Sequence, residues 1–541
     1  WLRRAVFRGL ARDPGARWPS MQALLAQLER GSRRGSPGLV AVGLVAAALT
    51  GGVWLGRDES PETCPDAQAS AEALWPASER AAVKAALEGT ELPFAADSAR
   101  KALATIDGYA AAWGRTSAQA CDAHRRGRLP ERPRLLQQRC LEQQATALRA
   151  IVEVLRSADA KVVENAVKIV GGLPEVDACQ DHAALIAASE LELPPPPELA
   201  PTIDGARAKL AGIAALDHAA RYDQARAALD RLAEDPRLRA YAPLAAELSS
   251  ASAINHRLRG EFPAAERAFW AAIGEAERGH AQPVKVRAAV DLTRLYINNI
   301  IRLDDGERWL ELAAAFVEAS ARPSRWAGDL ALLRGELAIG RSDYEAAIRH
   351  FEAARTLLAE SLGEDRLEVA EAIGLLGRAR RRHGQLREAA VLFDDSRQRL
   401  VALLGADHPA VANQINALGL VMLEQGDLQG ALAEFRRALA IRSAVLPANH
   451  PDLAVVLNNI GLALDRMGDH AEAAATHERA LAIRETSLGP DHPRVANSLH
   501  SLAIARISLG QLDEAEALGR RLMAFRARSK NPDHPDNAEV F

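Results

Sequence analysis

The fold is decided by residues 457–493, which read LNNIGLALDRMGDHAEAAATHERALAIRETSLGPDHP. The features of this stretch recur every 42 residues along the C-terminal part of the chain. The recurring positions are His408-Pro409, His450-Pro451, His492-Pro493 and His534-Pro535; Gly384, Gly426, Gly468 and Gly510; Ala389, Ala431, Ala473 and Ala515; and Leu404, Leu446 and Leu488. A fixed period of this length predicts a solenoid, in which each unit buries its apolar face against its neighbours.

Each unit of the repeat predicts two helices. Pro409 can begin the first, helix A, because the first turn of a helix leaves its N–H groups unbonded. Helix A then runs through VANQINALGLVMLEQ to Gly426, which ends it in the left-handed conformation. After the turn Asp427-Leu428, helix B runs through ALAEFRRALAIRSAVL. Small residues are expected where the two helices cross, and these are Gly419 and Gly461 in helix A and Ala431 and Ala438 in helix B.

This pattern resembles the tetratricopeptide repeat (TPR), and its 42-residue unit resembles the kinesin-light-chain subtype, over residues 366–541. Degenerate units, which keep the turn and the following Ala, extend the predicted solenoid over 203–541, with regular repeats only after about residue 365. The Pro-rich residues 194–202 predict a stiff linker before it. The resemblance implies an all-α protein built as an α-solenoid of TPR helix pairs.

The composition agrees with an all-helical chain. Of the 541 residues, 48% are hydrophobic, mostly Ala and Leu, which are the strongest apolar helix formers. Aromatic residues make up only 4%, which argues against a large aromatic-rich β-sandwich or barrel. The net charge of −4 gives no general attraction to nucleic acid, so we expect no nucleic-acid partner.

Residues 38–56 form an uncharged run, GLVAVGLVAAALTGGVWLG. A helix of this length extends about 28 Å, close to the roughly 30 Å hydrocarbon core of a bilayer. It follows an Arg-rich region that ends in a basic juxtamembrane segment, residues 31–37. The positive-inside rule therefore predicts a single-pass protein of the inner or plasma membrane, with its N-terminus in the cytoplasm and residues 57–541 outside. The alternative is a buried core helix.

Residues 57–193 predict a helical extracytoplasmic domain that holds all four cysteines, Cys64, Cys121, Cys140 and Cys179. An even number of cysteines confined to one such segment predicts two disulfides. Of the three possible pairings we favour Cys121–Cys140 inside Cys64–Cys179, which would close the two ends of the domain onto each other. A zinc site needs more closely clustered ligands, and four free thiols are the remaining alternative.

Residues 1–30 carry Arg12-Asp13-Pro14, then Arg17-Trp18-Pro19-Ser20, then leucines at helical spacing. This pattern resembles the end of a protein-kinase C-lobe, in which Arg17 would make a structural ion pair. The chain begins at Trp1, not at Met, and within an amphipathic segment, so we expect either a fragment or a misassigned start. It contains no Gly-rich phosphate loop, H-R-D or D-F-G motif. We therefore expect no catalytic residue and no cofactor in this chain, while ATP and Mg²⁺ are implied for a kinase domain preceding it.

Solenoids of this kind bind proteins or extended peptides in a concave groove lined by helix A. The candidate groove residues are Asn416, Asn458 and His500 in one column, Asn413 and Asn497 one turn earlier, and Asn459 beside Asn458. An asparagine amide both donates and accepts, so it can pair with the backbone of a protein or peptide ligand. The alternative is that these asparagines bridge adjacent repeats.

The His-Pro histidines form a second candidate set. Neighbouring packed helices lie about 8–10 Å apart, whereas zinc ligands lie about 2 Å from one ion. Histidines on successive repeats therefore cannot share a metal, and we expect no metal site. We expect these histidines to fix the loops between repeats instead.

Three functions fit these features. The first is the extracytoplasmic sensor region of a bacterial receptor-like Ser/Thr protein kinase, which binds a protein or peptide and couples to the kinase through a homodimer. The second is a non-catalytic, membrane-anchored TPR scaffold for protein complexes. The third is a soluble adaptor in which residues 38–56 are buried.

Overall fold

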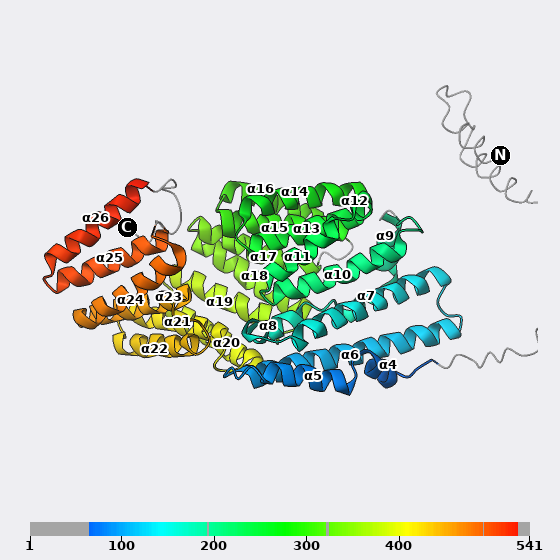
Figure 1. Cartoon of the computed structure of the whole chain (residues 1–541), viewed down its shortest axis with the longest axis horizontal. Coiled ribbons are helices and arrows are strands. Elements are labelled where there is room, and N and C mark those ends of the chain that lie inside the picture. Colours follow the sequence, from blue (N-terminus) through cyan, green and yellow to red (C-terminus); the bar gives the residue numbers. More distant parts are fainter. Residues whose placement is uncertain (1–63, 192–193, 321–323, 491, 529–541) are drawn as a thin grey trace, which may run out of the picture. The chain divides into compact units, whose positions relative to one another are not determined.

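The computed structural model describes residues 64–191, 194–320, 324–490 and 492–528. These ranges contain helices and turns but no strand, so the all-α prediction is confirmed. Figure 1 shows a first group of helices, blue to cyan, followed by a row of helices running from green to red. The kinase-like residues 1–30 with Arg17, and the predicted membrane span at 38–56, lie outside the described residues. None of the helices in the described ranges is long and apolar enough to cross a bilayer.

The first group of helices forms the cysteine-containing domain. Its elements are α4 (Ala67–Leu74), α5 (Ala77–Glu88), α6 (Ala95–Arg125), α7 (Glu131–Arg156), α8 (Ala160–Gly171), the 3₁₀ helix η2 (Val176–Cys179) and α9 (His182–Leu191). Leu87, Ile106 and Leu155 are fully buried at its centre, on three different helices. Their burial explains why the apolar residues of α5, α6 and α7 recur at helical spacing.

The cysteines are disulfide-bonded as expected, but the favoured pairing is wrong. Cys140 on α7 is bonded to Cys179 on η2, while Cys64 and Cys121 are each disulfide-bonded and no cysteine is free. Cys121 lies about 6 Å from the end of α6 and Cys140 about 13 Å into α7, at 1.5 Å per residue. With helix axes 8–10 Å apart, this offset of about 7 Å takes the two Cα atoms beyond disulfide reach.

From residue 200 the chain forms successive pairs of packed helices. They are α10 (Ala200–His218) and α11 (Tyr222–Ala233), the short α12 (Pro236–Ala240), α13 (Ala242–Leu258) and α14 (Phe262–Gly279), α15 (Gln282–Arg294) with the π-helix η3 (Leu295–Ile300) and α16 (Leu303–Glu318), α17 (Ser324–Gly340) and α18 (Tyr344–Leu362), α19 (Leu367–Arg382) and α20 (Leu386–Leu404), α21 (Pro409–Gln425) and α22 (Leu428–Ser443), α23 (Pro451–Met467) and α24 (His470–Leu488), and α25 (Pro493–Ser508) and α26 (Leu512–Arg528). Stacking of these pairs gives the predicted solenoid.

At four successive crossings, from α17–α18 to α23–α24, a glycine in helix A packs against a ring in helix B. The pairs are Gly335–Phe351, Gly377–Phe393, Gly419–Phe435 and Gly461–His477. A Cβ added to Gly419 would lie 2.6 Å from Cε1 of Phe435, well inside van der Waals contact. The helices therefore approach more closely than any side chain would allow, which confirms the prediction that small residues lie at the crossings.

The His-Pro pairs begin helices A, as predicted from Pro409. In α21, α23 and α25 the imidazole Nδ1 of the preceding histidine accepts the backbone N–H two residues later, at 3.1, 3.3 and 3.2 Å. Gly426 and Gly468 end α21 and α23 with φ of 86° and 87°. Both the start and the stop of helix A therefore follow from its sequence.

Helix B of the same repeat differs from its predicted bounds by three residues at each end. α22 begins at Leu428, because Oδ1 of Asp427 accepts the N–H of Gly430 at 3.0 Å and caps the helix. It ends at Ser443 rather than at Leu446. Pro447 follows, and the residue before a proline is disfavoured in a helix.

The cysteine-containing domain packs against the solenoid through helix α8 and the start of α6. Nε2 of His408 donates to the carbonyl oxygen of Glu164 at 2.9 Å, across 244 residues of sequence. The His408 ring also packs edge-on against Phe94, with 4.8 Å between ring centroids. Because Nδ1 of His408 accepts the N–H of Ala410, this histidine is neutral and joins the α21 cap to α8.

Candidate protein-binding groove

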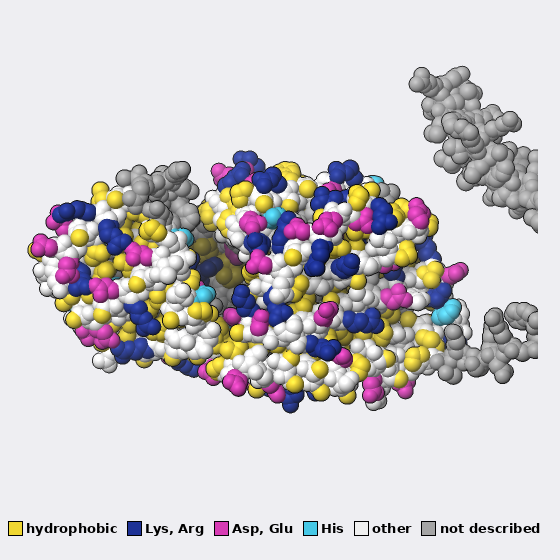
Figure 2. Space-filling view, viewed as in Figure 1, with side chains coloured by type: hydrophobic (Ala, Val, Ile, Leu, Met, Phe, Trp, Pro, Cys, Tyr) yellow, Lys and Arg dark blue, Asp and Glu magenta, His cyan; other side chains and the backbone are white. Residues whose placement is uncertain are grey.

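One face of helix A stays partly exposed in each of the last three repeats. We call it the groove face and define it by four positions per helix: Asn413, Asn416, Ala417 and Leu420 on α21; Val455, Asn458, Asn459 and Leu462 on α23; and Asn497, His500, Ser501 and Ile504 on α25. None of these residues is fully buried. Positions three and four residues apart share one side of a helix, so each set forms a continuous stripe. Figure 2 shows a hollow in the surface between the C-terminal repeats and helices α16–α18.

Three of the predicted groove asparagines form side-chain hydrogen bonds, two of them between repeats and one within a repeat. Nδ2 of Asn459 donates to Oδ1 of Asn416 at 2.9 Å and so joins α23 to α21. Oδ1 of Asn413 accepts from the guanidinium of Arg442 on α22. Bridging between repeats, the alternative noted from the sequence, therefore does occur at Asn416 and Asn459.

The other three predicted residues lie on the same face with different surroundings. Asn497 is partly buried and His500 is exposed. Asn458 is partly buried, and its Oδ1 is shielded from solvent without a hydrogen-bond partner among the described residues. A shielded amide oxygen without a partner costs about 1–3 kcal/mol, which favours a ligand or a local rotation that supplies a donor.

Two buried arginines support the groove face, and neither is among the residues predicted from the sequence. Nη1 of Arg442 donates to the carbonyl of Asp452 at 2.7 Å, and Nη1 of Arg484 donates to the carbonyl of Arg494 at 2.9 Å. Each arginine therefore ties a helix B to the first turn of the next helix A. Burial lowers the pKa of Arg442, opposed by the charge of Asp452. Their spacing of 42 residues was the signal that could have identified them.

In the preceding part of the solenoid, α15 to α19, charged side chains are packed between the helices. Arg294 donates to Asp291 at 2.6 Å and to Asp329 at 2.9 Å. Burial raises the pKa of Asp329, although the charge of Arg294 opposes that shift. On α19, burial lowers the pKa of Arg378. The helices A thus carry ion pairs in one half of the solenoid and neutral amides with apolar side chains in the other.

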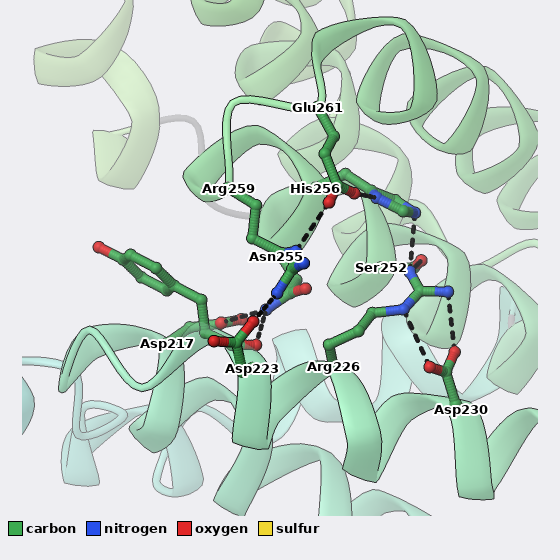
Figure 3. A network of polar contacts seen from close by, with 10 residues as sticks. Asp217, Asp223, Arg226, Asp230, Ser252, Asn255, His256, Arg259 and Glu261 are labelled. Atoms are coloured by element: carbon green, nitrogen blue, oxygen red, sulfur yellow. Dashed lines mark hydrogen bonds and ion pairs between the residues drawn. The ribbon is translucent and has the colours of Figure 1, made fainter. Parts of the chain in front are cut away.

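A polar network on α11, α13 and the loop before α14 places a serine, a histidine and a glutamate close together (Figure 3). Nδ1 of His256 lies 2.5 Å from Oε2 of Glu261, while Nη1 of Arg226 lies 2.7 Å from Nε2 of His256. The same Arg226 nitrogen donates to Oγ of Ser252 at 3.3 Å. Nε2 of His256 is the atom that would have to accept the Ser252 proton, and it is occupied by Arg226. This arrangement therefore joins α11 to α13 and does not activate Ser252.

A second buried pair in the same view, Asn255 and Asp217, has a similar structural role (Figure 3). Nδ2 of Asn255 donates to Oδ1 of Asp217 at 2.7 Å and to the carbonyl of Tyr222 at 3.0 Å. Burial raises the pKa of Asp217 to about 6, opposed by the Asn255 hydrogen bond. This pair joins α10 to α13 at the start of the solenoid.

Metal chemistry finds no support in the described ranges, where no three His, Cys, Asp or Glu side chains converge. His408, His450 and His492 each cap a different helix, and this confirms the expectation that they fix the loops between repeats. Their Nδ1 atoms are occupied by backbone N–H groups.

Comparison with known families agrees with the helix pairing. Residues 328–400, 410–486 and 452–528 match the family model described as tetratricopeptide repeat. These residues are TPR units. The matched ranges contain the crossing glycines from Gly335 to Gly461 and the whole groove face. No curated protein matches the chain.

Several solved structures are similar to parts of this chain. One titled for a kinesin light chain of Podosopora anserina is 24% identical and covers 39% of this chain and 99% of its own, with a TM-score of 0.33. BtubC from P. vanneervenii is 21% identical; the match covers 47% of this chain and 93% of BtubC, with a TM-score of 0.35. The apo form of RapI is 13% identical; the match covers 52% of this chain and 97% of RapI, with a TM-score of 0.42.

Proposed function

We propose that the solenoid is a protein-binding scaffold whose ligand lies on the groove face of α21, α23 and α25. TPR units are protein–protein interaction modules. The observation that carries the proposal is the stripe of partly exposed amide and aliphatic side chains on these three helices. Such a surface can hydrogen-bond a polypeptide backbone and bury apolar side chains at the same time.

Affinity capture with the chain and with an Asn458→Ala, Asn497→Ala variant tests this proposal. We expect the partner recovered by the unchanged chain to be lost or strongly reduced with the variant. An Asn165→Ala variant on α8, where the side chain donates only to its own helix at Lys161, is the matched control. Equal recovery by all three proteins would contradict a binding role for the groove face.

We further propose that this scaffold is the extracytoplasmic sensor region of a membrane-spanning bacterial Ser/Thr protein kinase. The Arg-rich start, the uncharged run at 38–56 and the kinase-like residues 1–30 support this arrangement. Complete disulfide bonding of the cysteines fits an oxidising compartment outside the cytoplasm. Ligand binding would change homodimerisation and thereby the activity of a kinase domain that this chain does not contain.

Membrane insertion is tested by replacing Leu44 and Val45 with arginine. Each mid-span arginine costs about 2.5–3.5 kcal/mol of insertion, so the double variant should leave the membrane fraction. Unchanged fractionation would contradict the membrane proposal.

The kinase parent is tested by the intact mass and N-terminal reading of the native protein. Upstream residues carrying Gly-rich, H-R-D and D-F-G motifs would support it. Their absence would favour the second candidate, a non-catalytic, membrane-anchored TPR scaffold.

A further inference from the structure

We propose that the ligand of the groove face is an extended, uncharged segment of a partner protein, in a polyproline II conformation, with an apolar side chain at every third residue. This inference rests on the proposed binding role and adds the chemistry and the periodicity of the ligand. It follows from the charges of the groove face, from its apolar stripe and from the position of α8.

The groove face carries no fixed charge. Its side chains on α21, α23 and α25 are amides, aliphatic groups, Ser501 and the titratable His500. The charged residues that follow one turn later are already engaged: Glu424 accepts from Arg381, and Arg466 donates to the carbonyl of Leu423 at 3.0 Å. A cationic ligand side chain would therefore be desolvated here without a counter-ion. An anionic one would meet only Arg442 and Arg484, which are buried and already donate to the carbonyls of Asp452 and Arg494. An uncharged segment avoids that cost.

An apolar stripe runs across the three repeats at a single position of helix A. It consists of Leu420, Leu462 and Ile504, and the last two are 38% and 46% exposed. Four residues earlier on the same side of each helix lie Asn416, Asn458 and His500. A ligand that buries aliphatic side chains on the stripe thus places its backbone beside polar groups that can bond it.

The distance between repeats selects the ligand conformation. The Asn459–Asn416 hydrogen bond shows that neighbouring helices A are in direct contact, and helices in contact lie 8–10 Å apart. Polyproline II has three residues per turn and rises about 3.1 Å per residue, so it presents the same side every 9.3 Å. In a β-strand, residues three apart point to opposite sides. Polyproline II therefore matches the stripe and a β-strand does not.

Helix α8 sets the N-terminal limit of the site. Val167 of α8 packs into the apolar cluster that contains Ala370 of α19 and Val411 of α21. The charge of Lys168 on α8 lowers the pKa of Glu371 on α19, against the stronger effect of burial. The start of α19 is thus partly covered by the protein itself. The three repeats beyond it each contact one apolar side chain of the ligand, and these side chains stand at ligand positions i, i+3 and i+6.

Selection of a random nine-residue phage-display library on the full chain tests the proposal. The comparison proteins are a Leu462→Glu, Ile504→Glu variant and a Val391→Glu control, since Val391 is 70% exposed on α20, outside the groove face. We expect the full chain and the control to enrich peptides with aliphatic residues at i, i+3 and i+6 and few charged residues. We expect a synthetic peptide of that consensus to bind the double variant at least tenfold more weakly.

The outcomes separate this inference from the proposed function. Enrichment of charged peptides, or of another spacing, that is lost in the double variant would overturn the inference and leave the groove as a binding site. Enrichment that is equal on all three proteins would overturn both. If residues 529–541 of the chain itself occupied the groove, the consensus peptide would bind only to a chain truncated after Arg528. A groove filled by a second copy would give a dimer in sedimentation that the double variant abolishes, and either result would overturn the inference.

Discussion

Replacing Gly419 by alanine tests the close crossing that holds the groove helices in place. The added Cβ would lie 2.6 Å from Cε1 and 2.8 Å from Cδ1 of Phe435, whose side chain is fully buried and cannot swing away. Overpacking of this kind costs up to about 3 kcal/mol, while alanine gains about 1 kcal/mol over glycine in a helix. We expect a net loss of about 2 kcal/mol. For a unit of roughly 200 residues, this lowers the melting temperature by about 4–8 °C.

The assay is urea unfolding followed by circular dichroism at 222 nm. Because repeat arrays can unfold in stages, hydrogen exchange of α21 and α22 amides should be measured as the local quantity. Gly205→Ala in α10 is the matched control, since a Cβ there meets nothing within 4 Å. It should raise stability by about 0.5–1 kcal/mol, so the two substitutions have opposite signs.

A Gly419→Ala, Phe435→Leu double variant completes the test. The smaller leucine side chain removes the clash with the alanine Cβ. The double variant should therefore lose less unfolding free energy than the sum of the losses in the two single variants. The reasoning is refuted if Gly419→Ala stabilises the protein as much as Gly205→Ala does, because the crossing would then have room for a side chain.

Three further predictions concern individual groups. His477 occupies the helix B position that Phe435 fills one repeat earlier, and its Nε2 lies 3.3 Å from Oδ2 of the largely buried Asp465. His477→Phe removes this partner of the carboxylate, so we expect it to lower the urea midpoint at pH 7. Burial lowers the pKa of His218 to about 4, with Lys168 and Arg287 adding to the shift. The folded state keeps this histidine neutral, so unfolding free energy should fall by up to about 3 kcal/mol between pH 6.5 and pH 4, and His218→Gln should flatten that profile. Cys140→Ser opens a loop of 39 residues and should cost about 4 kcal/mol in the chain-entropy model; non-reducing peptide mapping should recover Cys140 linked to Cys179.

The regular repeats were predictable because each of their features is local. Pro409 and Gly426 mark the two ends of α21 through backbone geometry that depends on those residues alone. The crossing at Gly419 follows from a spacing of 42 that is visible in the sequence. Local geometry also explains the error in helix B, where the Asp427 cap moved the start by one turn.

Features that depend on distant contacts could not be predicted in the same way. His408 donates to the carbonyl of Glu164, 244 residues earlier, and no periodicity in the sequence connects these two positions. The disulfide partner of Cys140 depends on where η2 folds back, which the spacing of cysteines does not specify. Both contacts involve residues of the cysteine-containing domain, where no repeat supplies a second copy of the pattern.

The two roles considered for the asparagines are compatible, because one amide has more bonding capacity than one bridge uses. An asparagine side chain offers two N–H donors and two acceptor lone pairs. The Asn459–Asn416 hydrogen bond uses one donor of Asn459 and one lone pair of Asn416 and leaves the remaining capacity to a ligand. The bridge also fixes both rotamers before a ligand arrives. Ordering one side chain on binding costs about 0.5–1.5 kcal/mol, so amides already fixed by a neighbouring repeat bind a backbone at a lower entropic cost than free ones would.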